Sequence, residues 1–345
     1  MVKLIRYLLF PFAILYGGIV ALRNFLFDKN ILKSSEFDVK TIQVGNLSAG
    51  GTGKTPHIEY LIRFLKEEFK ITTLSRGYGR KSTGFIVADD NSTAKEIGDE
   101  PLQFHKKFEE IEVTVGAKRV DAIVEIMSKE NTPEVILLDD AFQHRQLKSG
   151  FSILLTDYNS PFYKDFMLPT GNLREFPYGK KRADAIVVTK CPDLLSEEQK
   201  AKIIGKIKVN NIPVFFSKIQ YGEPGGIFNS NPFLLSKNQE IVLVTGIANP
   251  VPLQKHLATF GKKITHLKFP DHHSFTDKNI QQIIGTFNSI SSSNKLILTT
   301  EKDAMRLKEF ESLNELPIAQ LPIEIQFLEE EKEFKNLIKN YVASN

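Results

Sequence analysis

Short apolar runs alternate with longer, more polar stretches along most of this chain. The runs are rich in Ile, Val and Leu, as is typical of strands buried on both faces, and they are Ile42–Val44, Ile71–Leu74, Val135–Leu138, Ser152–Thr156 and Ala185–Thr189. Most of the segments between them are long enough for crossover helices, for example His57–Phe69 and Arg119–Ser128. This alternation predicts an α/β fold in which a parallel sheet is flanked by helices.

The pattern changes near residue 220. Residues 221–237 (YGEPGGIFNSNPFLLSK) are rich in Gly, Pro and Asn, which is typical of a linker or a hairpin. A second alternation of apolar and polar segments begins near Glu240. We therefore expect a larger α/β domain over residues 28–220, a linker or hairpin over 221–240 and a smaller C-terminal α/β domain over 241–345.

The N-terminal segment is more apolar than the rest of the chain. Between Arg6 and Arg23 lie 16 uncharged, mostly apolar residues. A spanning helix needs about 20 residues, so this one crosses a bilayer only if the two arginines snorkel to the interfaces. The segment lacks the small-x-small cleavage site that a signal peptide would have. We expect residues 1–27 to form an apolar membrane helix that either spans the bilayer or lies in its interface; the alternative is a buried helix of a soluble core.

Composition and charge narrow the choice of function. The 345 residues are 41% hydrophobic and 25% charged, an ordinary globular balance. The net charge of only +4 gives no indication of nucleic-acid binding. The single cysteine, Cys191, excludes an intramolecular disulfide framework and a cysteine zinc cluster, as expected for a reducing cytoplasm.

A glycine-rich loop follows the first apolar run. The usual phosphate-binding spacing is G-x-x-x-x-G-K-[ST], and here Ser48 replaces the first glycine. Main-chain amides of such a loop bind phosphate oxygens, the lysine contacts the β- and γ-phosphates, and the last hydroxyl joins the magnesium shell. We therefore expect a P-loop NTPase-like domain whose ATP-binding residues are Ser48, Ala49, Gly50, Gly51, Thr52, Gly53, Lys54 and Thr55.

The P-loop also needs a carboxylate that holds Mg²⁺ at the end of a neighbouring strand. The run Val135–Leu138 leads directly into Asp139 and Asp140. We expect these two aspartates and Thr55 to bind the metal, although acidic residues also follow strands simply as turn or capping residues. The sequence does not distinguish which aspartate is the direct ligand.

Three classes of P-loop protein compete: a GTP switch, a partitioning or metal-delivery ATPase, and a small-molecule kinase. A partitioning ATPase typically carries a signature lysine where Ala49 stands. A GTPase should show an Asn-Lys-x-Asp motif, but the partial echoes at 187–193 and 298–305 lack its asparagine. The kinase class instead needs additional polar chemistry outside the P-loop.

Four polar segments could supply that chemistry. Each has a plain structural alternative, such as helix capping for Asp99 before Pro101, solvated arginines, or histidines packed on phenylalanines. The segments are LSRGYGRKSTG (74–84), IGDEPLQFHKK (97–107), DDAFQHRQL (139–147) and FPDHHSFTD (269–277).

Taken together, the motifs resemble those of the tetraacyldisaccharide 4'-kinase (lipid A 4'-kinase) family. The resemblance extends from the N-terminal apolar helix to about Leu307, and the serine at the first P-loop position is shared with the family pattern. LPTGNLREF departs slightly from the family's commoner LPAGPLREP. In order, the motifs are GNLSAGGTGKTP, LSRGYGR, GDEP, VGAKR, LLDDAFQHRQL, LPTGNLRE, VVTK, FPDHHSF and TTEKDAMRL.

The resemblance implies a reaction and its catalytic groups. The family transfers the γ-phosphoryl group of ATP to the 4'-hydroxyl of a tetraacylated glucosamine disaccharide 1-phosphate, on the cytoplasmic face of the inner membrane. Asp99 is then the expected base, assisted by His272, with His273 as the near alternative. Lys54, Mg²⁺ and an arginine are expected to stabilise charge on the transferred group.

The same resemblance implies a glycolipid partner and a membrane, with no nucleic acid and no protein partner evident. We expect the substrate's 1-phosphate to bind one of three arginines and the cleft between domains to close on both substrates. The non-enzymatic alternative is a membrane-recruited P-loop switch or metallochaperone. The expected substrate-facing residues are Arg76, Glu100, Arg119, Gln143, His144, Arg145 and His273.

Overall fold

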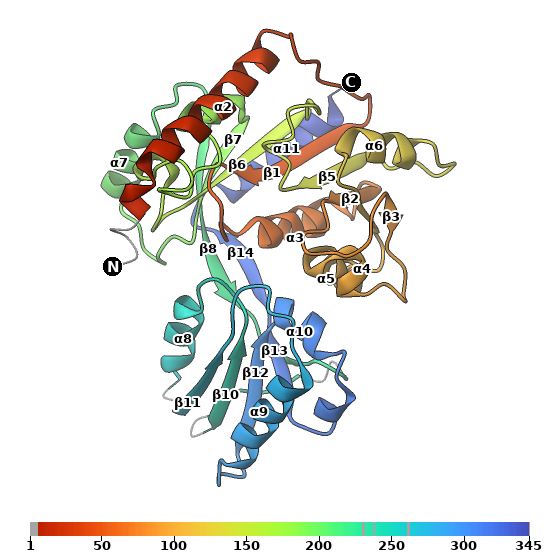
Figure 1. The fold of residues 1–345 in the computed structure, drawn as a ribbon, viewed down its shortest axis with the longest axis vertical. Coiled ribbons are helices and arrows are strands. Elements are labelled where there is room, and N and C mark those ends of the chain that lie inside the picture. The colour runs from red at the N-terminus through yellow and green to blue at the C-terminus, as the bar shows by residue number, and fades with distance from the viewer. Residues whose placement is uncertain (1–5, 230–231, 237–238, 261–262, 345) are drawn as a thin grey trace.

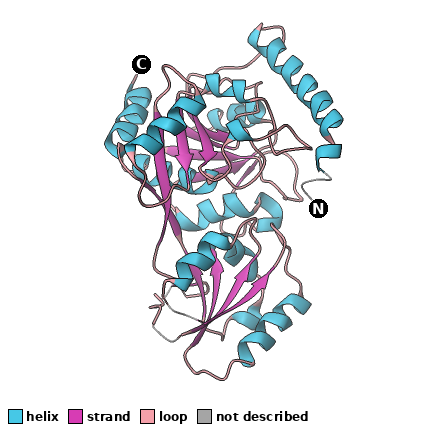
Figure 2. Cartoon of the chain, turned by 90° about the vertical axis from the view of Figure 1, so that its left-hand side faces the viewer, coloured by secondary structure: helices cyan, strands magenta, loops and turns pink. Residues whose placement is uncertain are grey.

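The protein folds into a larger and a smaller lobe, each built around its own sheet (Figure 1). This computed structural model describes residues 6–229, 232–236, 239–260 and 263–344. Strands β8 and β14 run from the larger lobe toward the smaller one and connect the two (Figure 1). Figure 2 shows the two sheets apart from each other, one in each lobe.

The sheet of the larger lobe has nine strands within the described residues, in the order β14-β8-β7-β6-β1-β5-β2-β4-β3. Its central strands are parallel, and only the edge strands β14 and β3 pair in the antiparallel sense. The strands are β1 (Lys40–Asn46), β2 (Ile71–Ser75), β3 (Ile86–Val87), β4 (Glu112–Val115), β5 (Val135–Asp139), β6 (Phe151–Asp157), β7 (Ala185–Thr189), β8 (Val214–Tyr221) and β14 (Ile323–Phe327).

All five apolar runs are strands of this sheet, so the predicted parallel α/β fold is confirmed. Their residues alternate between two cores: Val135 and Leu137 face one, whereas Ile136 and Leu138 face the other. Helices cover both faces, which explains why the runs are continuously apolar. They are α2 (Phe10–Asp28), α3 (Lys54–Leu65), α4 (Ala94–Ile97), α5 (Asp99–Lys107), α6 (Arg119–Met127), α7 (Glu197–Ile207), α11 (Glu331–Ala343) and the short 3₁₀ helices η1 (Phe162–Lys164) and η2 (Pro177–Arg182).

The first crossover helix begins earlier than expected. The prediction was His57–Phe69, but α3 begins at Lys54 because Gly53, with φ of 89°, turns the P-loop directly into the helix. Its apolar residues recur at helical spacing and pack against the sheet, and they are Ile58, Leu61, Ile62 and Leu65.

The smaller lobe contains a five-stranded sheet in its described part, in the order β11-β10-β12-β13-β9. Strands β10, β11, β12 and β13 are parallel, and β9 is antiparallel to β13. The elements are β9 (Gly225–Gly226), β10 (Glu240–Thr245), α8 (Val251–Ala258), β11 (Lys263–Lys268), α9 (Asp277–Asn288), β12 (Lys295–Thr300), α10 (Glu301–Leu307), η3 (Glu311–Leu313) and β13 (Ile318–Leu321).

The C-terminal segment does not follow the expected boundaries. Residues 241–345 were placed together, but β14 returns to the first sheet and pairs with β8 from Ile323↔Tyr221 to Phe327↔Ser217. Helix α11 follows it, and Phe334 joins the core of the larger lobe. An alternating strand pattern specifies the buried face but not the sheet, which is why the sequence did not reveal this return. The expected linker over 221–240 also contributes β9; residues 230–231 and 237–238 lie outside the described residues.

Helix α2 lies along the outer side of the larger lobe (Figure 2). It is long and apolar enough to cross a membrane, and only 17% of its most apolar window is buried against the protein. A helix of a soluble core would be mostly buried, so the exposure of α2 favours contact with another apolar medium.

We predict that Phe334→Ala lowers the stability of the larger lobe by about 3–5 kcal/mol, because a buried aromatic side chain leaves a cavity. Phe334 packs against the rings of Phe215 and Phe327. Thermal unfolding followed by circular dichroism should show a clearly lower Tm than for Lys332→Ala, an exposed position on the same helix. Equal Tm values for the two variants would contradict the assignment of α11 to this core.

Candidate active site

The P-loop connects β1 to α3 and is held from several sides. Thr52 accepts at Oγ1 from the Asn46 side chain over 2.8 Å, and its carbonyl accepts from the Thr189 hydroxyl over 2.9 Å. The Lys190 ammonium donates to the Gly51 carbonyl. Because these contacts come from β1 and β7, the loop is positioned by the carboxyl ends of two strands of the sheet.

Not all of the expected loop residues face the same way. Ser48 forms a bridge with Leu173, and the Ala49 amide donates to the Asn172 carbonyl over 2.7 Å, so this part of the loop is bound to the segment around 172. Gly50 and Gly51 are exposed, and Gly50 has φ of 119°, a conformation that favours glycine. The exposed turn and the first turn of α3, with Lys54 and Thr55, are the parts available to a nucleotide.

The two aspartates among the expected metal ligands differ sharply in their surroundings. Asp140 accepts from Arg174 Nη2 over 2.7 Å and Nη1 over 3.0 Å, and its Oδ2 lies 3.8 Å from Lys54 Nζ. Burial alone would raise the pKa of Asp140, but Lys54 and Arg174 lower it below its ordinary value. Asp139 is buried, and burial together with the charge of Asp140 raises its pKa to about 7.

Asp139 fits a cation at this position. Its Oδ1 has no hydrogen-bond partner among the described residues. Strand β5 places it beside the end of β1, since Val44 pairs with Asp139, and therefore beside the start of the P-loop. Carboxylate and hydroxyl oxygens are suitable ligands for Mg²⁺, so Asp139, Asp140 and the Thr55 hydroxyl form a donor set of the right chemistry.

A second polar centre lies where α5 of the larger lobe meets the smaller lobe. The Asp99 carboxylate receives three hydrogen bonds across this contact: His272 Nδ1 to Oδ2 over 3.0 Å, Arg306 Nε to Oδ1 over 2.8 Å, and Arg306 Nη2 to Oδ2. Burial opposes ionisation of Asp99, but the bonds from Arg306 and His272 outweigh it and hold its pKa at about 2.

The structure places the two neighbouring histidines differently. His272 contacts Asp99 and adopts φ of 55°, whereas His273 stacks on Phe269 and its Nε2 lies 3.0 Å from Asn279 Oδ1. Glu100 forms an ion pair with Lys302 over 2.9 Å. Of the two histidines that the sequence left open, only His272 lies beside Asp99.

The expected substrate residues divide into free and engaged groups. Arg76 is exposed just after β2. Gln143 donates to the Asn46 carbonyl and to Glu175, each over 2.8 Å. Arg145 pairs with Asp28 over 2.7 Å, at the end of α2. Arg119 is only 2% exposed and donates to the carbonyls of Gly116 and Asp139. Arg76 therefore has the greatest freedom to meet a ligand.

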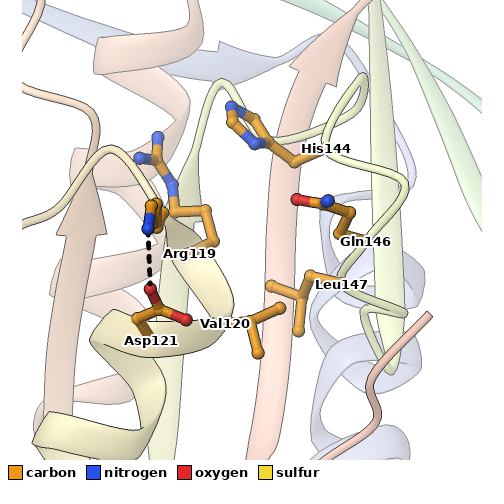
Figure 3. Close-up of a pocket in the computed structure, with 7 residues that line it drawn as sticks. Arg119, Val120, Asp121, His144, Gln146 and Leu147 are labelled. Atoms are coloured by element: carbon orange, nitrogen blue, oxygen red, sulfur yellow. Dashed lines mark ion pairs between the residues drawn. The ribbon is translucent and has the colours of Figure 1, made fainter. Parts of the chain in front are cut away.

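Arg119 and His144 nevertheless line one cavity of about 250 Å³, between the start of α6 and the 144–147 segment. Figure 3 shows the guanidinium of Arg119 and the ring of His144 at the same end of this pocket. Arg119 Nε has no partner within the described chain. Burial is the main reason that the pKa of His144 is lowered to about 4. The positive charges of Arg119 and Arg76 lower this pKa further, whereas Asp140 raises it.

Buried polar contacts connect the helix that follows the P-loop to the helix that carries Asp99. Glu59 of α3 accepts from Gln103 and from Lys107, both of α5, over 2.7 Å each. Lys107 also contacts Glu301 of α10. Lys107 of α5 thus joins α3 and α10 by binding a buried carboxylate on each.

Several residues of the site were not expected from the sequence. Lys302 and Arg306 lie in the TTEKDAMRL motif, where their i, i+4 spacing places both on one helical face. Arg174 lies in LPTGNLREF, and Glu59 lies on the buried side of α3. The motifs marked these segments, but only the fold shows which carboxylates they meet.

Comparisons with known proteins agree over the whole length of the chain. A model of the family described as Tetraacyldisaccharide-1-P 4'-kinase matches residues 5–343. Proteins named Tetraacyldisaccharide 4'-kinase are similar to it: that of Flavobacterium johnsoniae is 47% identical over 99% of both chains, and that of Flavobacterium psychrophilum is 51% identical over 99% of this chain and 98% of its own.

A solved structure also matches nearly all of the fold. It is the crystal structure of the "apo" form of LpxK from Aquifex aeolicus in complex with ATP, with a TM-score of 0.78 and 30% identity over 98% of this chain and 99% of that one. Sequence and architecture thus agree from the N-terminal helix to α11, and this chain belongs to the tetraacyldisaccharide 4'-kinase family.

Proposed function

We propose that this protein transfers the γ-phosphoryl group of ATP to the 4'-hydroxyl of a tetraacyldisaccharide 1-phosphate, a step of lipid A biosynthesis. The observation that carries the proposal is the hydrogen-bonded Asp99–His272 pair, held between the lobes of a chain that also has a P-loop. Family membership supports the same reaction. Membership of this family does not favour the alternative of a membrane-recruited switch or metallochaperone.

In this reaction Asp99 orients the acceptor hydroxyl and receives its proton. A pKa of about 2 makes Asp99 a weak base. In a loose phosphoryl-transfer transition state the nucleophile bonds only weakly to phosphorus. The hydroxyl therefore becomes acidic late, as its oxygen bonds to phosphorus, and a well-placed weak base is then sufficient.

Lys54 and the exposed P-loop turn bind the triphosphate, as supported by the position of Lys54 in the first turn of α3. Asp139, Asp140 and Thr55 would hold Mg²⁺. When bound, this ion neutralises charge on the β- and γ-phosphates. Asp140 also holds Arg174 beside the P-loop, which adds a cation close to the transferred group.

The substrate's own 1-phosphate has a candidate site in the pocket of Arg119 and His144. The unpartnered Nε of Arg119 and the nearby charge of Arg76 make this pocket attractive to an anion. Arg76 is exposed and can reach a ligand, whereas Arg119 contributes from a fixed, buried position. Arg145 is less suited to this role because it pairs with Asp28.

We propose that α2 lies in the membrane interface instead of crossing the bilayer. Its inner side is bonded to the larger lobe, since the Tyr16 hydroxyl donates to the Arg174 carbonyl over 3.0 Å and Asn24 donates to Glu175 over 3.0 Å. Arg6, which precedes α2, donates to the Gly171 carbonyl over 2.9 Å. A spanning helix would have to break these bonds in a medium without water. Its other side exposes large apolar residues.

This orientation brings the active site to the lipid. Moving four acyl chains into water is unfavourable by about 0.8 kcal/mol per CH₂, so the enzyme must work where its acceptor lies. ATP is supplied from the cytoplasm, and we place the active site on the cytoplasmic face of the inner membrane.

The direct test combines the purified protein, ATP, Mg²⁺ and tetraacyldisaccharide 1-phosphate, with mass spectrometry of the lipid. The proposal requires a second phosphate on the disaccharide and ADP in equal amount. ATP hydrolysis at the same rate with and without the acceptor would identify a switch-like ATPase instead.

We predict that Asp99→Asn lowers kcat by about 10²- to 10⁴-fold, the usual contribution of a general base. The affinity for ATP should change little, because the nucleotide is bound by the P-loop. Steady-state kinetics and nucleotide titration separate the two effects. Asp277→Asn, an exposed carboxylate at the start of α9, serves as the control and should retain full activity. Normal turnover in Asp99→Asn would eliminate Asp99 as the base.

We also predict that Arg76→Gln raises KM for the acceptor by about tenfold, which is the loss of one charged hydrogen bond. An acceptor without the 1-phosphate should show no difference between this variant and the wild type. An equal effect on both acceptors would exclude recognition of the 1-phosphate by Arg76.

For the membrane contact, we predict that the double substitution Leu15→Lys, Leu22→Lys releases the protein from anionic vesicles. Both side chains are exposed on α2, and burial of each contributes about 1.5–3 kcal/mol. Flotation with the vesicles measures the bound fraction. Val124→Lys, an exposed apolar position on α6, is the matched control. Flotation of the double variant at the wild-type level would contradict α2 as the contact.

A further inference from the structure

Two cations of the smaller lobe surround the Asp99–His272 pair, and the mechanism above gives them no role beyond their effect on the pKa of Asp99. Lys302 and Arg306 lie one turn apart on α10. Lys302 Nζ lies 2.9 Å from His272 Nε2 and 2.9 Å from Glu100 Oε1. Arg306 contacts both oxygens of Asp99 and donates through Nη1 to the His273 carbonyl over 2.8 Å.

The contact with Lys302 determines which nitrogen of His272 carries hydrogen. A lysine ammonium can only donate, so the ring nitrogen that it meets must accept. Nε2 is therefore the bare nitrogen, and the hydrogen of the neutral ring is on Nδ1, from which it is donated to Asp99 Oδ2 over 3.0 Å. The opposite tautomer would leave two donors facing each other at Nε2 and would place a bare Nδ1 against the Asp99 carboxylate over 3.0 Å. Arg306 Nη2 could donate to that bare nitrogen, but it lies farther away, at 3.5 Å.

The same contacts limit where a substrate can bind to Asp99. A carboxylate has about four acceptor positions, two on each oxygen. Arg306 Nη2 and His272 Nδ1 occupy both positions on Oδ2, and Arg306 Nε occupies one on Oδ1. A single position remains, and it lies on Oδ1.

We propose that Lys302 and Arg306 are positioning residues for phosphoryl transfer: Lys302 fixes the Nδ1-protonated form of His272, and Arg306 orients Asp99 so that only Oδ1 can accept the sugar hydroxyl. The inference rests on the proposed function of Asp99 as the base. It adds a route for the proton and two residues whose side chains need not touch either substrate.

The route of the proton follows from the occupied positions. The sugar O–H bond breaks and its proton passes to Asp99 Oδ1. The sugar oxygen bonds to the γ-phosphorus, and the bond between the γ-phosphorus and ADP breaks with its electron pair on ADP. His272 cannot take the proton onward, since Nδ1 already carries hydrogen and Nε2 faces the Lys302 ammonium. The proton therefore stays on Asp99 until the product leaves.

The groups that face Asp99 also link its geometry to the position of the lobes. Asp99 and Glu100 belong to α5 of the larger lobe, whereas His272, Lys302 and Arg306 all belong to the smaller one. Separation of the lobes would remove every one of these partners from Asp99 at once. The base is therefore assembled only when the lobes are together.

The tautomer can be measured without any turnover. In full-length protein labelled with ¹⁵N-histidine, the imidazole shifts distinguish a protonated from a bare nitrogen, and the His272 signals are those missing in His272→Gln. We expect Nδ1–H with a bare Nε2 in the wild type and a mixture of tautomers in Lys302→Met. A wild-type His272 protonated on Nε2 would overturn the inference, even in a protein that phosphorylates the lipid.

Kinetics test the consequence for catalysis. Lys302→Met should lower kcat by about 10- to 100-fold, as for residues that orient a metal ligand through a hydrogen bond, and KM for ATP should be unchanged. Lys302→Arg should restore most of kcat because it keeps a donor. The matched control is Lys95→Met, which removes another ion pair between the lobes, that with Glu309 over 2.9 Å. Equal kcat for Lys302→Met and Lys95→Met would overturn the positioning role. If the wild type shows the expected tautomer of His272 but no kinase activity, that result counts against the proposed function alone.

Discussion

The site depends on keeping one buried carboxylate ionised between two lobes. Asp99 is removed from water, which by itself favours its neutral form. Hydrogen bonds from Arg306 and His272 of the opposite lobe, together with the charges of Arg306 and Lys302, reverse this preference. Asp99 is therefore ionised only when the two lobes are correctly placed, because the larger lobe alone does not supply its partners.

The P-loop end of the site is connected to Asp99 through the helices. Glu59, on the helix that follows the P-loop, is bound by Gln103 and Lys107 of the Asp99 helix, and Lys107 also reaches Glu301. A buried ion pair contributes little net stability but defines geometry when every partner is satisfied. Such a network fixes the position of α3, which follows the P-loop, relative to the helix that carries Asp99. The β8–β14 pair then connects the lobes while the polar contacts set their relative position.

The sequence predicted much of the fold because the relevant signals are local. Apolar runs buried on both faces identify the parallel strands, and the glycine loop identifies the nucleotide-binding turn. The return of β14 to the first sheet could not be predicted, since its alternating pattern fits either sheet. The pairing of Asp99 with Arg306 joins residues 207 positions apart and depends on how the lobes meet. Arg119 had the residue type expected for a phosphate ligand, but its burial against the Gly116 and Asp139 carbonyls gives it a structural role as well.

The most direct test is a crystal structure with a non-hydrolysable ATP analogue, Mg²⁺ and the disaccharide 1-phosphate bound together. The measurement is the distance from Asp99 Oδ1 to the oxygen of the 4'-hydroxyl. We expect hydrogen-bond contact, about 2.6–3.2 Å, with that oxygen facing the terminal phosphate. A 4'-hydroxyl remote from Asp99, with the carboxylate still enclosed by Arg306 and His272, would contradict the account.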